Sequence, residues 1–331
     1  DILLCRTDRI LPADIKKKIA LFCNVSEEAV ITAKDVQSIY EVPLILAKEG
    51  LDAIILKNLD LPYRDKDIAD WVQIVEIVKN PAAETHIALV GKYVEYEDSY
   101  KSLTEALIHG GLANKAKVNI HWIEAEGMEN EALRQQLAGM DGILIPGGFG
   151  IRGVSGMIHA IRFAREKRFP FFGICLGLQC AVIEFARDVC GMTDADSTEF
   201  NPDSSRKVIY KLKELEGVES MGANMRLGRY PCLLEPGSFA QRAYGKSEIS
   251  ERHRHRYEVN RALAEDLVKR GLRITGQSPD GRFVEIIELP DHPWFLACQF
   301  HPEFKSKPLA PHPLFRSFIA ACLKHRAESR R

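Results

Sequence analysis

Short apolar runs alternate with helix-like segments from residue 86 to residue 187, and this alternation constrains the fold more than any other feature. Between the runs, apolar residues recur at helical spacing, as at Leu103, Ala106 and Leu107. The runs have the length of buried strands and lie at residues 87–91, 118–123, 142–146 and 171–174. Strands that alternate with helices predict an α/β fold with an open, mainly parallel sheet flanked by helices on both faces.

The rest of the chain differs from this alternating part. After residue 188 the pattern is β-rich, which predicts additional antiparallel strands, and a helix-like segment follows at 314–324. Residues 1–60 contain too few elements to close a core, so we expect a short remnant of a second α/β domain there. Residues 61–84 read as a linker with one helix, and residues 85–328 as the main domain.

Composition narrows the class of protein. The chain is 46% hydrophobic and 27% charged, as in soluble globular proteins, and no apolar run is long enough to span a bilayer. A net charge of −1 gives no electrostatic reason to expect binding to nucleic acid or to a membrane surface. The eight cysteines include no C-x-x-C pair, so we expect a cytoplasmic protein without a metal site.

The run at 171–174 leads into Gly-Ile-Cys-Leu-Gly at 173–177, and a helix-like segment follows directly. This is the layout of a nucleophile elbow, with Cys175 in place of the usual serine. A helix that starts here aims backbone N–H groups at the sulfur and favours the reactive thiolate. The pentapeptide alone leaves a second interpretation open, because most cysteines are small buried apolar groups.

A possible partner for Cys175 follows another apolar run, at 294–298. His301 then falls at the end of a strand, and in an extended chain Glu303 points the same way as His301. A carboxylate beside an imidazole fixes its tautomer and stabilises the imidazolium. The motif therefore predicts a general base with its orienting acid.

Two further stretches could bind a ligand. The glycine-rich loop at 146–153 could present backbone N–H groups to a developing oxyanion, or it could be only a tight turn before a helix. The basic run at 251–258 could supply one arginine to a substrate carboxylate, with the other charges solvated. Glu199 is a lone acid in a loop-like region and is uninformative by itself.

These motifs, in this order, resemble the class I glutamine amidotransferases, and the longer strings resemble the CTP synthase family. Residues 1–46 resemble the end of that family's amidoligase, or synthetase, domain. The strings that carry the resemblance are 147–153, 173–179, 197–201, 225–228, 252–260 and 298–304. The resemblance covers nearly the whole chain.

The resemblance implies roles for individual residues. Cys175 would be the nucleophile, His301 the general base and acid, and Glu303 its orienting partner. The oxyanion would meet the backbone N–H groups of Gly148 and Leu176. The residues implied to bind glutamine are Gly148, Leu176, Gly177, Leu178, Gln179, Glu199 and Arg256.

For the N-terminal segment, the resemblance implies nucleotide contacts. Lys18 matches a UTP or CTP contact, and Lys34, Asp35 and Val36 match an ATP contact. The family's P-loop, its magnesium-binding carboxylates and most of its UTP site have no counterpart in these residues. We therefore expect glutaminase activity alone from these 331 residues, with no cofactor.

In the complete enzyme, the resemblance implies that ATP and Mg²⁺ drive the amination of UTP to CTP by the released ammonia. It also implies GTP as an allosteric activator and assembly into homodimers, homotetramers or filaments. Two other functions stay open. One is a stand-alone γ-glutamyl hydrolase or peptidase of the same fold, and the other is a regulatory or assembly module without turnover.

Overall fold

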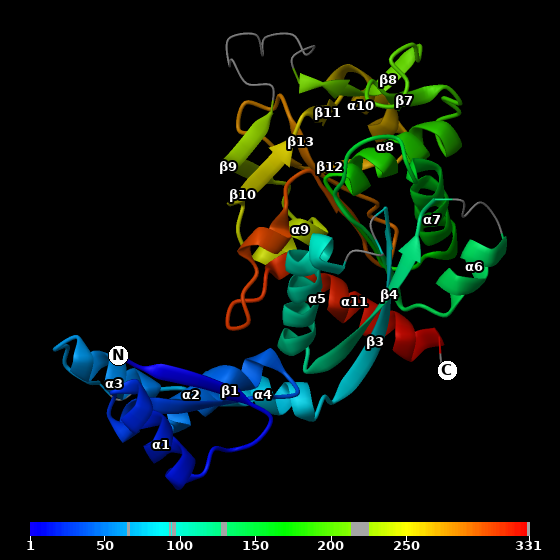
Figure 1. The fold of residues 1–331 in the computed structure, drawn as a ribbon. Helices are drawn as coiled ribbons and strands as arrows, with labels where there is room; N and C mark the ends of the chain where they lie inside the picture. The colour runs from blue at the N-terminus through cyan, green and yellow to red at the C-terminus, as the bar shows by residue number, and fades with distance from the viewer. Residues whose placement is uncertain (65–66, 93, 95–96, 127–130, 213–224, 330–331) are drawn as a thin grey trace. The chain divides into compact units, whose positions relative to one another are not determined.

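The computed structural model describes residues 1–64, 67–92, 94, 97–126, 131–212 and 225–329. The chain forms two compact units, Asp1–Pro81 and Ala82–Arg331 (Figure 1). The division after residue 81 falls inside the segment 61–84, where the sequence predicts a linker.

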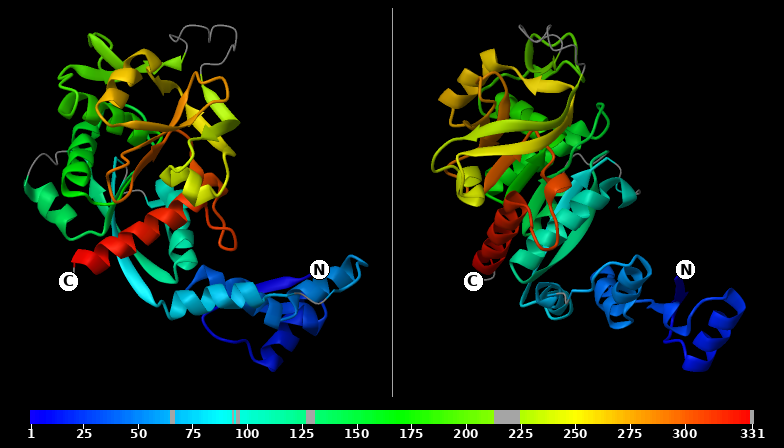
Figure 2. Two further views of the ribbon diagram at one scale, coloured as in Figure 1. Left: turned by 180° about the vertical axis from the view of Figure 1, so that it is seen from behind. Right: turned by 90° about the vertical axis from the view of Figure 1, so that its left-hand side faces the viewer.

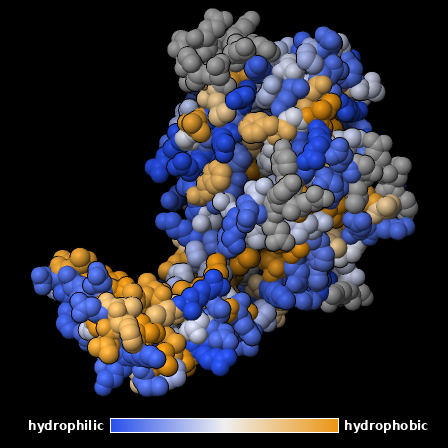
Figure 3. Space-filling view, viewed as in Figure 1, coloured by the Kyte–Doolittle hydropathy of each residue, from blue (hydrophilic) through white to orange (hydrophobic). Residues whose placement is uncertain are grey.

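The N-terminal unit is built on two strands that pair in parallel. Its elements are β1 (Leu3–Thr7), α1 (Ala13–Cys23), β2 (Val30–Lys34), α2 (Val42–Lys48), α3 (Leu51–Asn58) and α4 (Ala69–Lys79), with 3₁₀ helices at Glu27–Ala29 and Ile39–Glu41. Leu21 and Phe22 of α1 are 79% and 77% exposed. Figure 3 shows apolar side chains gathered on the surface of this unit. Many apolar side chains of this unit are therefore exposed instead of packed in its core.

The C-terminal unit is organised around one large sheet, which has nine strands in the described part of the chain. Its parallel strands are, in spatial order, β4 (Ala116–Glu124), β3 (Ala83–Gly91), β5 (Gly142–Ile145), β6 (Phe171–Ile174) and β14 (Phe295–Cys298). Antiparallel strands extend the same sheet beyond β14 in the order β13 (Val284–Glu288), β12 (Arg273–Gln277), β9 (Arg226–Leu234) and β10 (Glu248–His255). The predicted α/β class with an open parallel sheet and additional antiparallel strands is confirmed.

Helices cover both faces of this sheet (Figures 1 and 2). They are α5 (Lys101–Ala113), α6 (Glu131–Ala138), α7 (Val154–Lys167), α8 (Leu176–Asp188), α9 (Phe239–Tyr244), α10 (Arg261–Lys269) and α11 (Pro313–Ser329), with 3₁₀ helices at Glu97–Tyr100 and Pro302–Lys305. One apolar core joins the sheet to α7 and α8. A second core joins the opposite face to α5 and α11.

The central strands explain where the loops of interest lie. β5, β6 and β14 are buried along their whole length, as expected for parallel strands covered on both faces. Their carboxyl ends meet at one edge of the sheet, which is where α/β proteins bind ligands. A small separate sheet, formed by β7 (Ala195–Ser197), β8 (Arg206–Lys211) and β11 (Tyr257–Val259), lies beyond α8.

Candidate active site

Cys175 lies in the sharp turn between β6 and α8, and its backbone is strained. Its φ is +52° and its ψ is −99°, a backbone conformation that residues other than glycine rarely adopt. The turn is held because the Cys175 N–H donates to the Cys298 carbonyl at 2.8 Å and the Cys175 carbonyl accepts from Leu178 and Gln179. The predicted elbow is therefore present, and α8 begins at Leu176, two residues earlier than its sequence pattern indicates.

The two glycines that flank Cys175 are required by close packing. A Cβ on Gly173 would lie 2.9 Å from the Ala297 Cβ, and a Cβ on Gly177 would collide with the carbonyl oxygen of Ile145. The elbow thus presses directly against β5 and β14. The Gly-x-Cys-x-Gly pattern reflects the absence of space on both sides of the cysteine.

His301 and Glu303 are in direct contact, with His301 Nδ1 2.7 Å from Glu303 Oε1. The contact was expected from an extended chain, but the local structure differs. β14 ends at Cys298, and Pro302–Lys305 forms a 3₁₀ helix that folds the carboxylate back to the ring. The His301 N–H donates to the Arg252 carbonyl at 2.7 Å, so β10 supports this segment.

The electrostatics of His301 favour its charged form. Burial lowers the pKa of His301, but the Glu303 carboxylate and the Cys175 sulfur outweigh that effect and raise it well above its usual value. A cysteine that interacts with a charged imidazole is the pairing used by cysteine nucleophiles.

The glycine-rich loop lies directly over this pair. A Cβ on Gly147 would come within 2.9 Å of the His301 ring, so glycine is needed for the close approach. The loop is also held from behind by Lys92, whose ammonium donates to the carbonyls of Phe149 and Gly150. The Gly150 N–H donates to Glu199 Oε1 at 2.7 Å. Burial lowers the pKa of Lys92, which is 2% exposed.

A cavity of about 530 Å³ opens over the cysteine, within the C-terminal unit. Its walls include Gly147, Gly148, Cys175, His301 and Glu303. The cavity therefore brings together the predicted triad and part of the predicted oxyanion loop. A volume of this size is ample for an amino acid.

The cavity also has walls that the sequence reasoning missed. They include Tyr100, Lys101 and Phe304, and Lys92 lies behind the glycine loop. Arg254 also lines the cavity, and it comes from the basic run at 251–258 that was expected to supply one arginine. Lys92 directly follows β3, which ends at Gly91, and α/β proteins bind ligands at the carboxyl ends of their parallel strands, so its position was a usable signal. The residues at 98–103 carry no pattern that sets them apart from an ordinary helix start.

The other residues implied to bind glutamine surround the cavity to different extents. The first turn of α8, 176–179, is buried, and Gln179 Nε2 donates to the Tyr257 carbonyl at 3.3 Å. Glu199 and Arg256 lie outside the cavity lining. Burial raises the pKa of Glu199, opposed by Lys92 and Arg256, which lie close enough to interact with it.

The nucleotide-binding residues implied for the N-terminal unit lie on or near its surface. Lys18 is exposed on α1, and Lys34 is exposed at the end of β2. Asp35 forms an exposed ion pair with Arg6 at 2.8 Å, and Val36 is half-buried. None of their implied roles is tested by this arrangement.

The sequence matches known proteins over both units. Residues 95–321 match the class-I glutamine amidotransferase family, and residues 1–61 match the CTP synthase N-terminus. The chain belongs to the CTP synthase family of glutamine amidotransferases.

Individual relatives agree with this assignment. The CTP synthase of Acidobacterium capsulatum is 62% identical over 98% of this chain, and that of Koribacter versatilis is 61% identical over 98%. The chain spans 59% of the length of each of these two relatives. Among solved structures, the Trypanosoma brucei CTPS glutaminase domain with bound acivicin is 42% identical, with a TM-score of 0.68. The match covers 72% of this chain and 94% of that domain.

The described residues lack two kinds of structural feature. They contain no group of three or more His, Cys, Asp or Glu side chains arranged to hold a metal ion. They also contain no helix with the length and apolar character needed to cross a membrane.

Proposed function

We propose that the C-terminal unit hydrolyses L-glutamine to glutamate and ammonia, with Cys175 as the nucleophile. The observation that carries the proposal is the strained elbow cysteine in one cavity with the His301–Glu303 pair. Membership of the CTP synthase family supports the same chemistry. In this proposal no cofactor takes part in glutamine hydrolysis.

The reaction begins when the Cys175 thiolate attacks the side-chain amide carbon of glutamine. The oxyanion that forms is stabilised by the backbone N–H groups of Gly148 and Leu176, a contribution of about 3 kcal/mol for one such donor in measured cases. His301 then gives its proton to the leaving nitrogen, and ammonia departs as the C–N bond breaks. The product of this half-reaction is a glutamyl thioester on Cys175.

In the second half-reaction, His301 takes a proton from water, and the hydroxide attacks the thioester carbonyl. The C–S bond breaks, glutamate leaves, and the Cys175 thiolate with its charged His301 is restored. Glu303 keeps the imidazole oriented through both steps, because its carboxylate holds Nδ1 at 2.7 Å.

Glutamine itself is recognised in this proposal by charge and shape. The α-amino and α-carboxylate groups would pair with Glu199 and Arg256, and the first turn of α8 would form the wall beside the side chain. Glu199 and Arg256 lie outside the present cavity lining, so substrate binding would draw them toward it. Arg256 directly follows β10, and its side chain is exposed.

For the complete protein we propose that the ammonia aminates UTP to CTP in an ATP- and Mg²⁺-dependent reaction, with GTP as an activator. The match of residues 1–61 to the CTP synthase N-terminus supports this proposal. The exposed apolar surface around Leu21 and Phe22 fits a unit that packs against further chain. Lys18, Lys34, Asp35 and Val36 would contribute to its nucleotide sites. A cytoplasmic location and assembly into homodimers, homotetramers or filaments belong to the same proposal.

Replacement of Cys175 by alanine tests the glutaminase directly. We expect loss of ammonia release by a factor of about 10⁴ or more, because no other group can form the thioester. The measurement is glutaminase turnover, with Cys180→Ala as the matched control, since Cys180 is a buried cysteine on the same helix outside the cavity lining. Ammonia release that survives in Cys175→Ala would exclude the proposed nucleophile.

A further inference from the structure

The buried side of β10 carries ionisable residues where a sheet normally carries apolar ones. Along this strand the side chains alternate, and Arg252 and Arg254 are exposed, as is Arg256 directly after the strand. Glu251, His253 and His255 point into the protein and are 1%, 2% and 1% exposed. Buried charges stabilise a fold less well than apolar packing does, so their presence calls for another reason.

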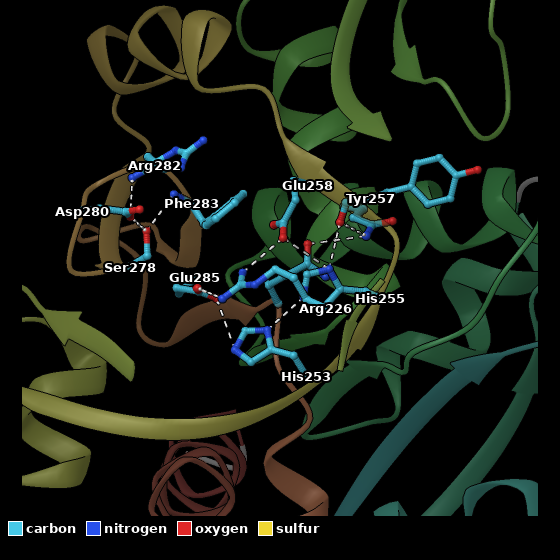
Figure 4. Close-up of polar contacts among 12 residues, drawn as sticks. Arg226, His253, His255, Tyr257, Glu258, Ser278, Asp280, Arg282, Phe283 and Glu285 are labelled. Atoms are coloured by element: carbon cyan, nitrogen blue, oxygen red, sulfur yellow. Dashed lines mark hydrogen bonds and ion pairs between the residues drawn. The ribbon is translucent and has the colours of Figure 1, made fainter. Parts of the chain in front are cut away.

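The two histidines belong to a cluster with a single cation, Arg226, at its centre (Figure 4). Arg226 donates to Glu258 at 3.1 Å and to Glu285 at 2.7 Å, and all three side chains are at most 4% exposed. One guanidinium thus faces two carboxyl groups away from water. With both carboxyls ionised the cluster would carry a net buried charge of −1, whereas one bound proton makes it neutral.

The hydrogen bonds of the cluster show which ring nitrogens of the two histidines carry hydrogen and which do not. His255 Nδ1 lies 3.1 Å from the Tyr257 carbonyl, which only accepts, so this nitrogen carries hydrogen. In a neutral ring, His255 Nε2 is then an acceptor, and it receives a hydrogen bond from His253 Nδ1 at 2.8 Å. His253 Nε2 is left without hydrogen, and it lies 3.6 Å from Glu285 Oε2.

Both atoms at that last contact are buried and have no hydrogen-bond partner. An ionised carboxylate and an unprotonated ring nitrogen would repel each other there. A proton on Glu285 Oε2 removes the repulsion, while Oε1 still accepts from Arg226. Only with that proton does each successive contact in the row from Glu285 to Tyr257 join a donor to an acceptor.

The surrounding charges place the proton on a carboxyl rather than on a ring. Burial, together with Arg226, holds the pKa of His253 and His255 well below the usual value. His301 acts on both rings in the same direction. Burial raises the pKa of Glu258 to about 8 and also raises that of Glu285, although Arg226 opposes both shifts. The Asp280 carboxylate also raises the pKa of Glu285.

The cluster is connected to the cavity at two points. The Tyr257 carbonyl that ends the row also accepts from Gln179 Nε2 at 3.3 Å, in the first turn of the nucleophile helix. Strand β10 carries Arg254, which lines the cavity, and the Arg252 carbonyl receives the His301 N–H. A shift of β10 would move the Arg254 side chain and the Arg252 carbonyl directly, and it would act on the Tyr257 carbonyl through the hydrogen bond from His255.

We propose that Arg226, His253, His255, Glu258 and Glu285 form a positioning network that holds one proton between Glu285 and His253 and so fixes the substrate side of β10. None of the five is a catalytic residue, since they act through Tyr257, Gln179 and the arginines. The link to glutamine rests on the proposed function, whereas the bound proton does not.

The bound proton is tested by the pH dependence of unfolding. A chain that holds this proton when folded and releases it when unfolded has a stability that falls as pH rises through neutrality. We expect Glu285→Gln and Glu258→Gln each to lower the number of protons released on unfolding near pH 7 by about one. Glu265→Gln is the control, because Glu265 is exposed, and it should leave the number of protons released on unfolding unchanged. An unchanged proton count in Glu285→Gln would overturn the shared proton.

The location of the proton is tested by labelling Cys175 with acivicin and measuring how well free glutamine protects Cys175 from this labelling. The side chain introduced by Glu285→Gln still carries a hydrogen-bond donor toward His253. The concentration of free glutamine that half-protects Cys175 should therefore be about the same in Glu285→Gln as in the unchanged chain. Glu258→Gln leaves Glu285 as the ionised partner of Arg226 and removes that donor, so about tenfold more glutamine should be needed. The reverse order of effects would overturn the assignment to Glu285. If acivicin does not label the unchanged chain, the proposed function fails, and the proton count still decides the network.

Discussion

Two regions of the C-terminal unit hold site residues by different physical means. The elbow around Cys175 is fixed by packing, because glycines at 173 and 177 leave no space and the neighbouring strands are fully buried. Strand β10, which carries Arg254 at the cavity, is fixed by buried charges centred on Arg226. Packing tolerates no change of volume, whereas a charge network tolerates changes that keep its hydrogen bonds. The difference predicts how each region responds to substitution.

The largest effect in this comparison is expected at Glu303, which contacts the ring of His301, the residue whose backbone N–H donates to the Arg252 carbonyl of β10. Glu303→Gln removes the negative charge that raises the pKa of His301, so that pKa should fall toward its usual value. We expect turnover to fall by a factor of about 10² to 10⁴, by analogy with other triads. The limb of the pH–rate profile that reports His301 should move to lower pH. A profile that does not move would mean that Glu303 does not orient or charge the ring.

Removal of Arg226 tests the charge network. Arg226→Met leaves two buried carboxyl groups without their cation, which should cost about 3–5 kcal/mol of unfolding free energy. The loss should grow as pH rises, because both carboxyls can be neutralised only by protons. Urea denaturation at several pH values measures it. Arg162→Met is the control, since the Arg162–Asp188 pair is partly exposed and should be worth at most about 1 kcal/mol. Equal losses in the two variants would contradict the network.

Packing at the elbow is tested by one methyl group. Gly177→Ala would place a Cβ against the Ile145 carbonyl, and we expect a loss of about 1–3 kcal/mol together with reduced turnover. Gly139→Ala is the matched control, because the nearest atom to a Cβ there is 4.0 Å away. Thermal unfolding and glutaminase assays report both quantities. A neutral Gly177→Ala would show that the elbow is not closely packed.

The elbow could be predicted from the sequence, whereas the charge network could not, and the reason for the difference is physical. The elbow follows a local pattern, in which glycines, an apolar run and a helix start are adjacent in the chain, so the sequence predicts the turn at Cys175, although the role of the cysteine also required its distant partner motifs. The contact of His301 with Glu303 was also local, although its 3₁₀ turn was not foreseen. The charge network was not predictable, because Arg226, His253 and Glu285 come from strands that the fold brings together. Residues 251–256 are all ionisable, so the sequence favoured a solvated run and gave no sign that one side of β10 is buried.

The same limit applies to the cavity walls. Lys92 is a charged residue in a segment typical of a surface loop, and only the tertiary structure shows that it is buried behind the glycine loop. The basic run at 251–258 was expected to supply one arginine, but only the tertiary structure shows that Arg254 lines the cavity. Burial of a lysine is rare enough that sequence reasoning rightly expects the opposite.

The central claim is that Cys175 is a nucleophile in a glutamine site, and labelling with acivicin tests it most directly. Mass spectrometry of the treated 331-residue chain should find one modified cysteine, Cys175, among the eight, and added glutamine should slow the modification. Modification of other cysteines, or labelling of Cys175 at a rate that glutamine leaves unchanged, would contradict the claim.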